Sequence, residues 1–428
     1  MNEWKSSKLG ELSSVNIGGT PSRTVEKYWA KTGQEDGVSW VAISDMKRRF
    51  IEATKESITP LGANNSNVKL VKAGTLMMSF KLSLGKMAFA SKNLYTNEAI
   101  ASFEIDESKV DKVFLYYQLS ETVKSAITDT AIKGVTLNKE KLNTLLIRHP
   151  SLQKQRGIAA ILSSIDDQID TTQTLIDKYT LIKQGMMADL FNRGIDTSSG
   201  QLRPSFEEAP ELYHKTDLGW LPKGWSTPTL ESLLADVNTP MRSGPFGSAL
   251  LKHELVQEGI PLLGIDNIFV EEFRSSYKRF VTAKKFQELS RYAVKPKDVV
   301  ITIMGTVGRT CVVPDNLGRA LSSKHLWTMT FDQARIIPEL VCWQLNHSEW
   351  VDSWFRKESQ GGVMEAIQSQ TLRQLKLVLP PEVEQKKIHE MYSTLNGQVD
   401  SNLRELAKLK LQKQGLMQDL LTGKVSIE

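Results

Sequence analysis

The chain carries one helical sequence twice. Residues 183–190 read KQGMMADL and residues 413–420 read KQGLMQDL, identical at six of eight positions and 230 residues apart (413 − 183). Earlier segments match in the same order, as LMMSFKLSLGK at 76–86 does with VVITIMGTVGR at 299–309. A tandem repeat constrains the fold strongly, because each copy must be able to form the same structural unit. We therefore expect two copies of one unit.

The spacing between matched residues grows along the chain. Trp4 matches Trp225, an offset of 221 (225 − 4), whereas Pro150 matches Pro380, an offset of 230 (380 − 150) that holds to the chain end. The second copy has therefore gained residues in its globular part and none in its helical tail. This is expected, because loops tolerate insertions and packed helical seams do not.

The globular parts mix strand-like and helix-like runs. Ser39–Ile43, Leu76–Phe80 and Ser102–Ile105 are typical of short strands, whereas Lys112–Lys124 and Pro338–Lys357 are typical of helices. This mixture predicts α/β (α+β) globular domains, two in tandem, each followed by a long α-helix.

Five segments follow from the repeat. They are a globular domain at 1–149, a long helix at 150–192, a linker at 193–224, a second globular domain at 225–380, and a second long helix with a C-terminal tail at 381–428. The linker contains RGIDTSSGQLRPSFEEAP, whose Ser, Pro, Gly and Glu residues are typical of an exposed connector.

The two tails show the spacing of a heptad repeat, alternating by four and three residues. The seam positions are Ile158, Leu162, Ile165, Ile169, Thr172, Ile176, Tyr179, Lys183, Met186 and Leu190 in the first tail, and Ile388, Tyr392, Leu395, Val399, Asn402, Leu406, Leu409, Lys413, Leu416 and Leu420 in the second. Matched polar residues favour two helices that pair with each other over two helices packed on separate domains. Each seam is roughly 50 Å long, and the residues alone leave parallel and antiparallel pairing open.

Composition is that of a soluble globular protein, with 40% hydrophobic and 24% charged residues. Two cysteines cannot build a disulfide framework, and neither a signal peptide nor a long apolar run is present, so we expect a cytoplasmic protein without a membrane segment. The basic excess lies in residues 1–150, with 21 Lys and Arg against 16 Asp and Glu. This excess permits a nucleic-acid partner without demonstrating one.

No catalytic or metal-binding motif is recognisable. The sequence lacks a Walker A loop, a zinc spacing of Cys and His, an HExxH helix and a G-x-S-x-G turn. The segment GTVGR at 305–309 lacks the third glycine of a dinucleotide fingerprint. These patterns alone do not exclude an enzyme, but none of them proposes a catalytic residue, a metal site or a bound cofactor.

Six loops combine glycine, hydroxyl and basic residues, with equivalents in both copies. They are GGTPSR (18–23), SDMKRR (44–49), KLSLGK (81–86), MRSGPFGSALLKH (241–253), GRT (308–310) and SSKH (322–325). Hydroxyl groups, backbone amides and basic side chains hold phosphates, and Arg and Lys also read base edges. Singly each is typical of a surface loop, but together they favour a polyanionic partner.

Over nearly its whole length the chain resembles the specificity subunit, HsdS, of type I restriction–modification systems. The resemblance rests on GGTPSR followed by Tyr28, Trp29 and Trp40, GPFGS at 244–248, GTVGR, the P-x4-Q-[RK] starts of both tails, KQGLMQDLLTGK, and the linker RGIDTSSGQLR with LGWLPKGW. The order of these motifs within a tandem repeat is more specific than any one of them.

The resemblance implies two target-recognition domains, each reading one half of a bipartite, gapped double-stranded DNA site. It implies two long helices that pack as an antiparallel coiled coil with pseudo-twofold symmetry, set the gap and dock two methyltransferase subunits. Two restriction–translocase subunits would complete an adenine-methylating, ATP-dependent endonuclease. The specificity subunit itself would be non-catalytic and would bind neither S-adenosylmethionine nor ATP.

Candidate residues follow from this interpretation. The candidates for DNA contact are Thr20, Ser22, Arg23, Lys47, Arg48, Arg49, Lys81, Ser83 and Lys86 in the first domain, and Arg242, Ser243, Ser248, Lys252, Arg309, Ser323, Lys324 and His325 in the second. The candidates for subunit docking are Lys183, Gln184, Gly185, Lys413, Gln414 and Gly415, with simple helix packing as the alternative. A scaffold that holds two partner proteins and binds no DNA is the rival function, and a metal-dependent nuclease is a weaker one.

Overall fold

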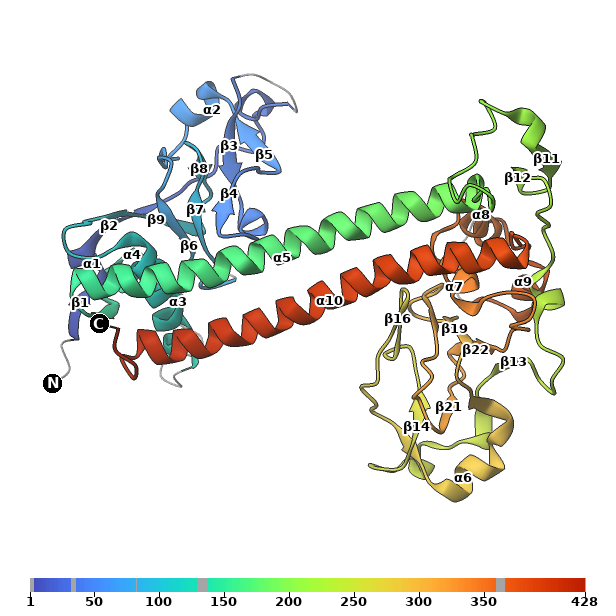
Figure 1. Ribbon diagram of the computed structural model, residues 1–428. Helices are drawn as coiled ribbons and strands as arrows, with labels where there is room; N and C mark the ends of the chain where they lie inside the picture. The colour runs from blue at the N-terminus through green and yellow to red at the C-terminus, as the bar shows by residue number, and fades with distance from the viewer. Residues whose placement is uncertain (1–3, 32–35, 82, 129–136, 359–365, 428) are drawn as a thin grey trace. The chain divides into compact units, whose positions relative to one another are not determined.

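The computed structural model describes residues 4–31, 36–81, 83–128, 137–358 and 366–427 (Figure 1). The chain divides into two compact units. One comprises Met1–Leu175 with Asn402–Glu428, and the other comprises Ile176–Ser401. Each unit therefore joins one globular domain to part of both long helices.

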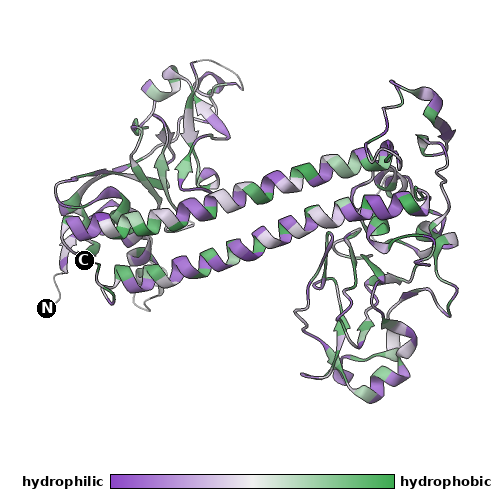
Figure 2. Cartoon of the chain, viewed as in Figure 1, coloured by the Kyte–Doolittle hydropathy of each residue, from purple (hydrophilic) through white to green (hydrophobic). Residues whose placement is uncertain are grey.

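Both predicted tails are helices, and they pair antiparallel. α5 spans Leu152–Asn192 and α10 spans Glu382–Leu421. In the first unit, Lys154 lies near the start of α5, and its side-chain nitrogen donates to the hydroxyl of Ser426, just beyond the end of α10, at 3.4 Å. In the second unit, the amide of Ile195, just beyond α5, donates to Glu384 near the start of α10 at 2.6 Å. Every predicted seam residue is buried or half-buried, and polar and apolar residues alternate along both helices in Figure 2.

The first domain is built on two sheets. The larger has the order β2 (Ser13–Ile17), β9 (Ile100–Ile105), β6 (Leu76–Ser79), β7 (Met87–Ala90) and β4 (Phe50–Ile51), and the smaller has the order β5 (Glu56–Ile58), β3 (Val38–Val41) and β8 (Tyr95–Thr96). Helix α3 (Lys112–Thr128) and the first part of α5 contribute to the same core as the larger sheet, through Phe114 and Leu162. The remaining elements are β1 (Lys5–Lys8), paired with β10 (Leu146–His149), and helices α1 (Leu9–Leu12), α2 (Pro60–Asn64) and α4 (Lys139–Thr144).

The second domain repeats both sheets. One has the order β13 (Met241–Ser243), β22 (Leu326–Met329), β19 (Val299–Thr302) and β20 (Thr310–Val312), and the other has the order β17 (Phe280–Val281), β14 (Ile260–Leu263), β21 (Ala320–Ser322) and β18 (Ala293–Val294). A hairpin, β15 (Ile268–Phe269) and β16 (Glu272–Phe273), and helices α6 (Ala283–Glu288), α7 (Pro338–His347), α8 (Glu349–Glu358) and α9 (Ser369–Gln374) complete it. The first three strands of the second sheet match β5, β3 and β8 of the first domain.

Matched buried glutamines fasten each long helix to its own domain. Gln155 donates to the carbonyl of Pro150 at 2.9 Å and accepts from the amide of Asp111 at 2.8 Å. Gln385, the equivalent residue, donates to the carbonyl of Pro380 at 2.9 Å and accepts from a domain amide at 3.1 Å. The P-x4-Q motif is therefore a helix-entry clamp that occurs once in each unit.

Two expectations differ from the structure. The single helix predicted for Pro338–Lys357 is two helices, because Ser348 between α7 and α8 has extended backbone angles (φ −87°, ψ 128°). The linker is ordered rather than a simple exposed connector, since it forms the hairpin β11 (Tyr213–Thr216) and β12 (Gly219–Pro222). It is also anchored to α10 by Arg203, which hydrogen-bonds the buried carboxylate of Glu384.

The entry clamp yields a stability prediction. Replacing Gln385 with Ala leaves the amide of Ile337 without its partner and should lower the free energy of unfolding by about 1–3 kcal/mol. Urea unfolding of the full chain measures this. The exposed Gln414→Ala is the matched control and should change stability by less than about 0.5 kcal/mol. Equal stability of the two variants would contradict the clamp.

Candidate nucleic-acid interface

In the first domain, two indoles hold the GGTPSR loop in place. Trp40 donates from its ring nitrogen to the carbonyl of Gly19 at 2.9 Å, and Trp29 donates to the carbonyl of Ser22 at 3.2 Å. The loop lies so close to the end of β8 that a Cβ added at Gly18 would be 2.2 Å from the carbonyl oxygen of Thr96. Only glycine fits there, so the loop conformation is fixed by its contacts.

Polar side chains gather around this loop. Arg23 makes a bidentate ion pair with Glu56, and its guanidinium lies 3.7 Å from the centre of the Trp29 ring. The hydroxyl of Thr20 donates to Glu98. This hydrogen bond, helped by the positive charges of Lys81 and Arg23, lowers the pKa of Glu98. Four predicted contacts, Thr20, Ser22, Arg23 and Lys81, therefore lie in one region, beside two carboxylates that a search for basic residues overlooks.

The other predicted contacts of the first domain divide between surface and interior. Lys47, Arg48, Ser83 and Lys86 are exposed. Arg49 is less exposed than these four residues. Its side chain is 12% exposed and pairs with Asp167 of α5 at 2.5 Å. This guanidinium joins the domain to the long helix, so Arg49 is less accessible to DNA than the exposed candidates.

In the second domain, a pocket of about 240 Å³ collects the corresponding loops. Its lining residues include four predicted contacts and one residue that the sequence analysis missed, namely Lys252, Ser323, Lys324, His325 and Arg279. The GPFGS loop approaches closely here, since a Cβ at Gly244 would lie 2.0 Å from the carbonyl oxygen of Ser322. Burial, together with the charges of Lys324 and Arg279, lowers the pKa of His325.

Two predicted contacts of the second domain lie in its interior. Arg242 and Ser243 are 7% and 6% exposed. The guanidinium of Arg242 pairs with Asp298 and donates to the carbonyl of Ala293 at 2.8 Å. Their polar groups bond inside the domain, so Arg242 and Ser243 are less accessible to DNA than the exposed candidates.

An exposed arginine that the sequence analysis did not single out lies beside Arg309. The guanidinium of Arg274 is 3.6 Å from the centre of the Phe269 ring, and that of Arg309 is 5.3 Å from it. Arg274 also makes two hydrogen bonds to Glu272, at 2.7 and 3.0 Å. Predicted Ser248 lies in an exposed turn of the GPFGS loop. The second domain therefore has a second group of oriented donors around Phe269.

A buried charged network joins the second domain to the long helices. Glu271, at the turn of the β15–β16 hairpin, pairs with Lys183 of α5 and accepts from the hydroxyl of Tyr392 of α10 at 2.9 Å. Burial alone would raise the pKa of Glu271, but the nearby ring of His347, with its Nε2 3.5 Å from the carboxylate, and the charge of Lys183 lower it to about 2. The hairpin is thereby fixed to both helices.

The first unit contains a matching network. Lys413 pairs with Asp166 at 2.6 Å, and Tyr117 donates to the same carboxylate at 2.6 Å. Lys183, the equivalent of Lys413, bonds to Asn396, the equivalent of Asp166, at 3.0 Å. These contacts favour helix packing over subunit docking for the two lysines.

The other docking candidates are exposed. Gln184, Gly185, Gln414 and Gly415 all lie on the surface of the helices, and a Cβ at either glycine would meet open space. Leu181 and Leu411, at matched positions four residues before the glycines, are 68% and 70% exposed. Each helix therefore presents the same leucine, glutamine and glycine pattern on its surface.

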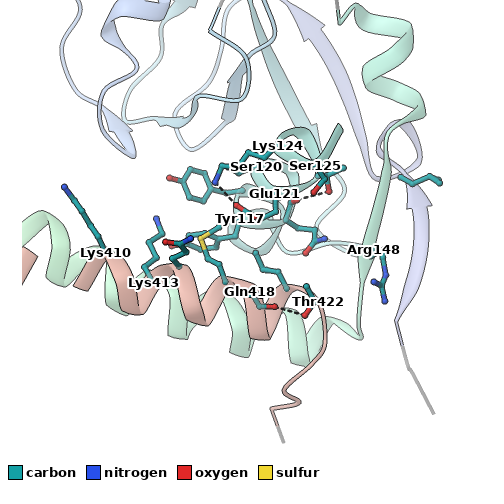
Figure 3. Close-up of a pocket in the computed structure, with 17 residues that line it drawn as sticks. Tyr117, Ser120, Glu121, Lys124, Ser125, Arg148, Lys410, Lys413, Gln418 and Thr422 are labelled. Atoms are coloured by element: carbon teal, nitrogen blue, oxygen red, sulfur yellow. Dashed lines mark hydrogen bonds and ion pairs between the residues drawn. The ribbon is translucent and has the colours of Figure 1, made fainter. Parts of the chain in front are cut away.

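A groove of about 840 Å³ lies beside this pattern in the first unit. Figure 3 shows Lys413 and Gln418 of α10 on one side and residues of α3, among them Tyr117, on the other. Its described lining includes four basic residues and one acidic residue, namely Lys124, Arg148, Lys410, Lys413 and Glu121. The groove therefore suits an acidic segment better than a basic one.

Other kinds of site were sought in the same residues. Among the residues that the structure describes, no three His, Cys, Asp or Glu side chains are grouped as a metal site. No helix in the described part of the chain combines the length and apolarity needed to cross a membrane. Both cysteines, Cys311 and Cys342, are buried free thiols, and burial raises the pKa of each.

Known proteins resemble this chain over most of its length. Residues 1–180 match the family described as type I restriction modification DNA specificity domain. The MjaVIII specificity subunit of Methanocaldococcus jannaschii is 21% identical, over 100% of this chain and 94% of its own. The EcoBI specificity subunit of Escherichia coli is 21% identical, over 78% and 69%. A crystal structure of the type I S subunit from M. genitalium aligns with a TM-score of 0.59 at 15% identity, over 97% and 96%.

The charged network yields a pH prediction. Because the pKa of Glu271 falls from 4.5 to about 2 on folding, its contribution to stability is present above 4.5 and is lost as the pH falls towards 2. The contribution is on the order of 2–3 kcal/mol. Glu271→Gln should therefore be less stable than the wild type at neutral pH, with a difference that shrinks between about pH 5 and pH 2.

Urea unfolding of the full chain across this range measures the difference. Glu258→Gln removes an exposed carboxylate of the same domain and serves as the control. A difference between wild type and Glu271→Gln that stayed constant with pH would show that Glu271 titrates normally in the folded protein.

Proposed function

The chain belongs to the specificity subunits of type I restriction–modification systems, and on that premise we propose that its two globular domains read the two halves of one gapped DNA site. The specificity subunit is the non-catalytic component of such a system. The proposal is supported by one observation above all. Each domain holds a glycine-containing loop against a matched turn, which precedes β9 in the first domain and β22 in the second, and exposed donors surround both loops.

The chemistry of these loops suits duplex DNA. Arg23 is held in one orientation by a carboxylate and an aromatic ring, so little side-chain entropy is lost when it binds. A guanidinium oriented in this way can present two donors to a guanine edge. Lysines such as Lys47, Lys86 and Lys252 are exposed and suit backbone phosphates. The domains would thus combine base reading with phosphate contact.

The long helices would set the length of the unread gap. A domain that could swing on its helix would accept several gap lengths, whereas the networks around Glu271 and Asp166 fix each domain to the helix pair. The matched surface patterns around Gly185 and Gly415 would dock two methyltransferase subunits. Two restriction–translocase subunits would join that assembly in the cytoplasm, where the complex would methylate adenine and cleave with ATP.

Selection from random duplexes tests the reading function. The full chain, alone and with the methyltransferase encoded beside it, is incubated with a random duplex library at two salt concentrations. The expected product is a sequence of two parts separated by a fixed gap, with affinity that falls steeply with salt. Enrichment of no sequence, with a stable methyltransferase complex, would instead favour the scaffold that binds no DNA.

Docking has its own prediction. Leu181→Asp and Leu411→Asp each place a charge on one of the two matched helix surfaces, and each should remove one bound methyltransferase, giving one per chain where the wild type binds two. Native mass spectrometry of the purified complexes counts them. Gln168→Asp, which places the same charge at an exposed position several turns before Leu181 on another side of α5, is the control. Two bound subunits in both leucine variants would place docking elsewhere.

A further inference from the structure

The two domains carry opposite charges at two equivalent places. In the first domain β3 pairs antiparallel with β5, so that Trp40 lies opposite Glu56. In the second domain β14 pairs antiparallel with β17, and the amide of Leu262 bonds to the carbonyl of Arg279 at 2.9 Å. The last residues of β3 and β14, Val41 and Leu263, match each other, and Trp40 and Leu262 come directly before them. The residues paired with Trp40 and Leu262, which are Glu56 and Arg279, therefore correspond as well.

The second exchange of charge lies in the turn before β9 in the first domain and before β22 in the second. β3 pairs in parallel with β8, placing Val41 beside Thr96, and β14 pairs in parallel with β21, placing Leu263 beside Ser322. Glu98 and Lys324 both follow two residues after these positions. A glutamate in the first domain is therefore a lysine in the second.

These exchanges give the two loop regions different electrostatics. In the first domain the charge of Arg23 is compensated by Glu56, with Glu98 close by. In the second, none of the described residues that line the 240 Å³ pocket is acidic, whereas Lys252, Lys324 and Arg279 are basic. Among the residues that the structure describes, Arg279 pairs with one carboxylate, that of Asp266. A cluster of cations on a concave surface attracts an anion.

The pocket is rigidly built around Arg279. The guanidinium lies directly on the backbone of Gly264, where a Cβ would be 2.1 Å from its nearer terminal nitrogen. Asp266 holds the same nitrogen. Gly264 is itself fixed by Asn267, whose side chain accepts from its amide at 3.0 Å. The guanidinium therefore has one position rather than many, which lowers the entropy cost of binding a ligand.

Two polar atoms at the pocket have no hydrogen-bond partner among the described residues. One is the hydroxyl of Ser323, a residue only 8% exposed, and the other is the Nε of Arg279. Buried polar groups are normally paired, and an unpaired one costs about 1–3 kcal/mol. An acceptor seated in the pocket could provide the partner that both atoms lack.

We propose that this pocket of the second domain binds a phosphate group, and that the first domain has no such site. Arg279 and Lys324 would supply charge-assisted donors, and Ser323 would supply a hydroxyl donor. The apolar wall, with Leu250 and Leu262, would contact the sugar attached to the phosphate. On the proposed function the phosphate belongs to the DNA backbone, and the site would act as a fixed anchor for the second half-site.

The first test uses inorganic phosphate and the full chain without DNA. Binding is followed by phosphorus NMR line broadening at constant ionic strength. The wild type should bind, and Arg279→Gln should weaken binding at least tenfold. Lys324→Gln removes an exposed charge, so its expected weakening cannot be attributed to misfolding. Lys284→Gln, on α6 of the same domain, is the control and should bind phosphate as the wild type does.

The second test identifies the source of the phosphate. A series of duplexes carrying the selected site has one backbone phosphate at a time replaced by an uncharged methylphosphonate. If DNA supplies the phosphate, one replacement in the second half-site weakens the wild type and leaves Arg279→Gln unaffected, and the variant shows a salt slope smaller by about one. If a small phosphorylated molecule supplies it, Arg279→Gln loses phosphate binding while its DNA affinity and salt slope stay unchanged.

The proposal is overturned if the wild type does not bind phosphate, or if Arg279→Gln and Lys324→Gln both bind it as the wild type does. Failure of the proposed function would give a different experimental result. In that case no duplex sequence would be selected, although phosphate binding and its loss in Arg279→Gln would persist.

Discussion

The structure depends on the antiparallel pairing of two long helices whose seams contain charged and polar residues at matched places. Lys183 is buried and Lys413 is half-buried at the helix–domain junctions. A buried lysine is costly unless a partner is present, and each of these has one, in Glu271 and in Asp166. Removing either partner would leave an uncompensated charge, so the networks favour one arrangement of domain and helices within each unit.

Duplication has preserved the backbone of the two units while exchanging their charges. Arg49 and Glu271 both fix a domain loop to the long helices, with opposite sign. Glu56, the first residue of β5, corresponds to Arg279, the residue before β17, again with opposite sign. A shared framework can thus support two recognition surfaces of different chemistry, as expected if each domain reads a different half-sequence.

Sequence reasoning reached those features whose signal is local or periodic. Every position chosen by the heptad spacing is buried or half-buried, and the run predicted as a strand at Leu76–Phe80 contains the central strand β6. The buried glutamines Gln155 and Gln385 were recognised as part of a motif, although their role as clamps needed the structure.

What sequence reasoning missed depends on partners that are distant in the chain. From the sequence, Arg242 is typical of a cation on an exposed loop. Its pairing with Asp298, 56 residues away in the chain, is evident only in the structure. Arg279 was overlooked because it belongs to a strand edge rather than a glycine-rich loop, and only the strand register shows that it matches Glu56. The helix break at Ser348 is a single extended residue within an otherwise helical pattern.

The central claim, that this chain chooses one gapped DNA sequence for modification, is tested most directly by modified-base sequencing of the host genome with the gene intact and deleted. The account predicts that a single two-part adenine-methylation motif, with a fixed gap, disappears on deletion and returns on complementation. An unchanged methylation pattern, with the neighbouring methyltransferase still expressed, would contradict it.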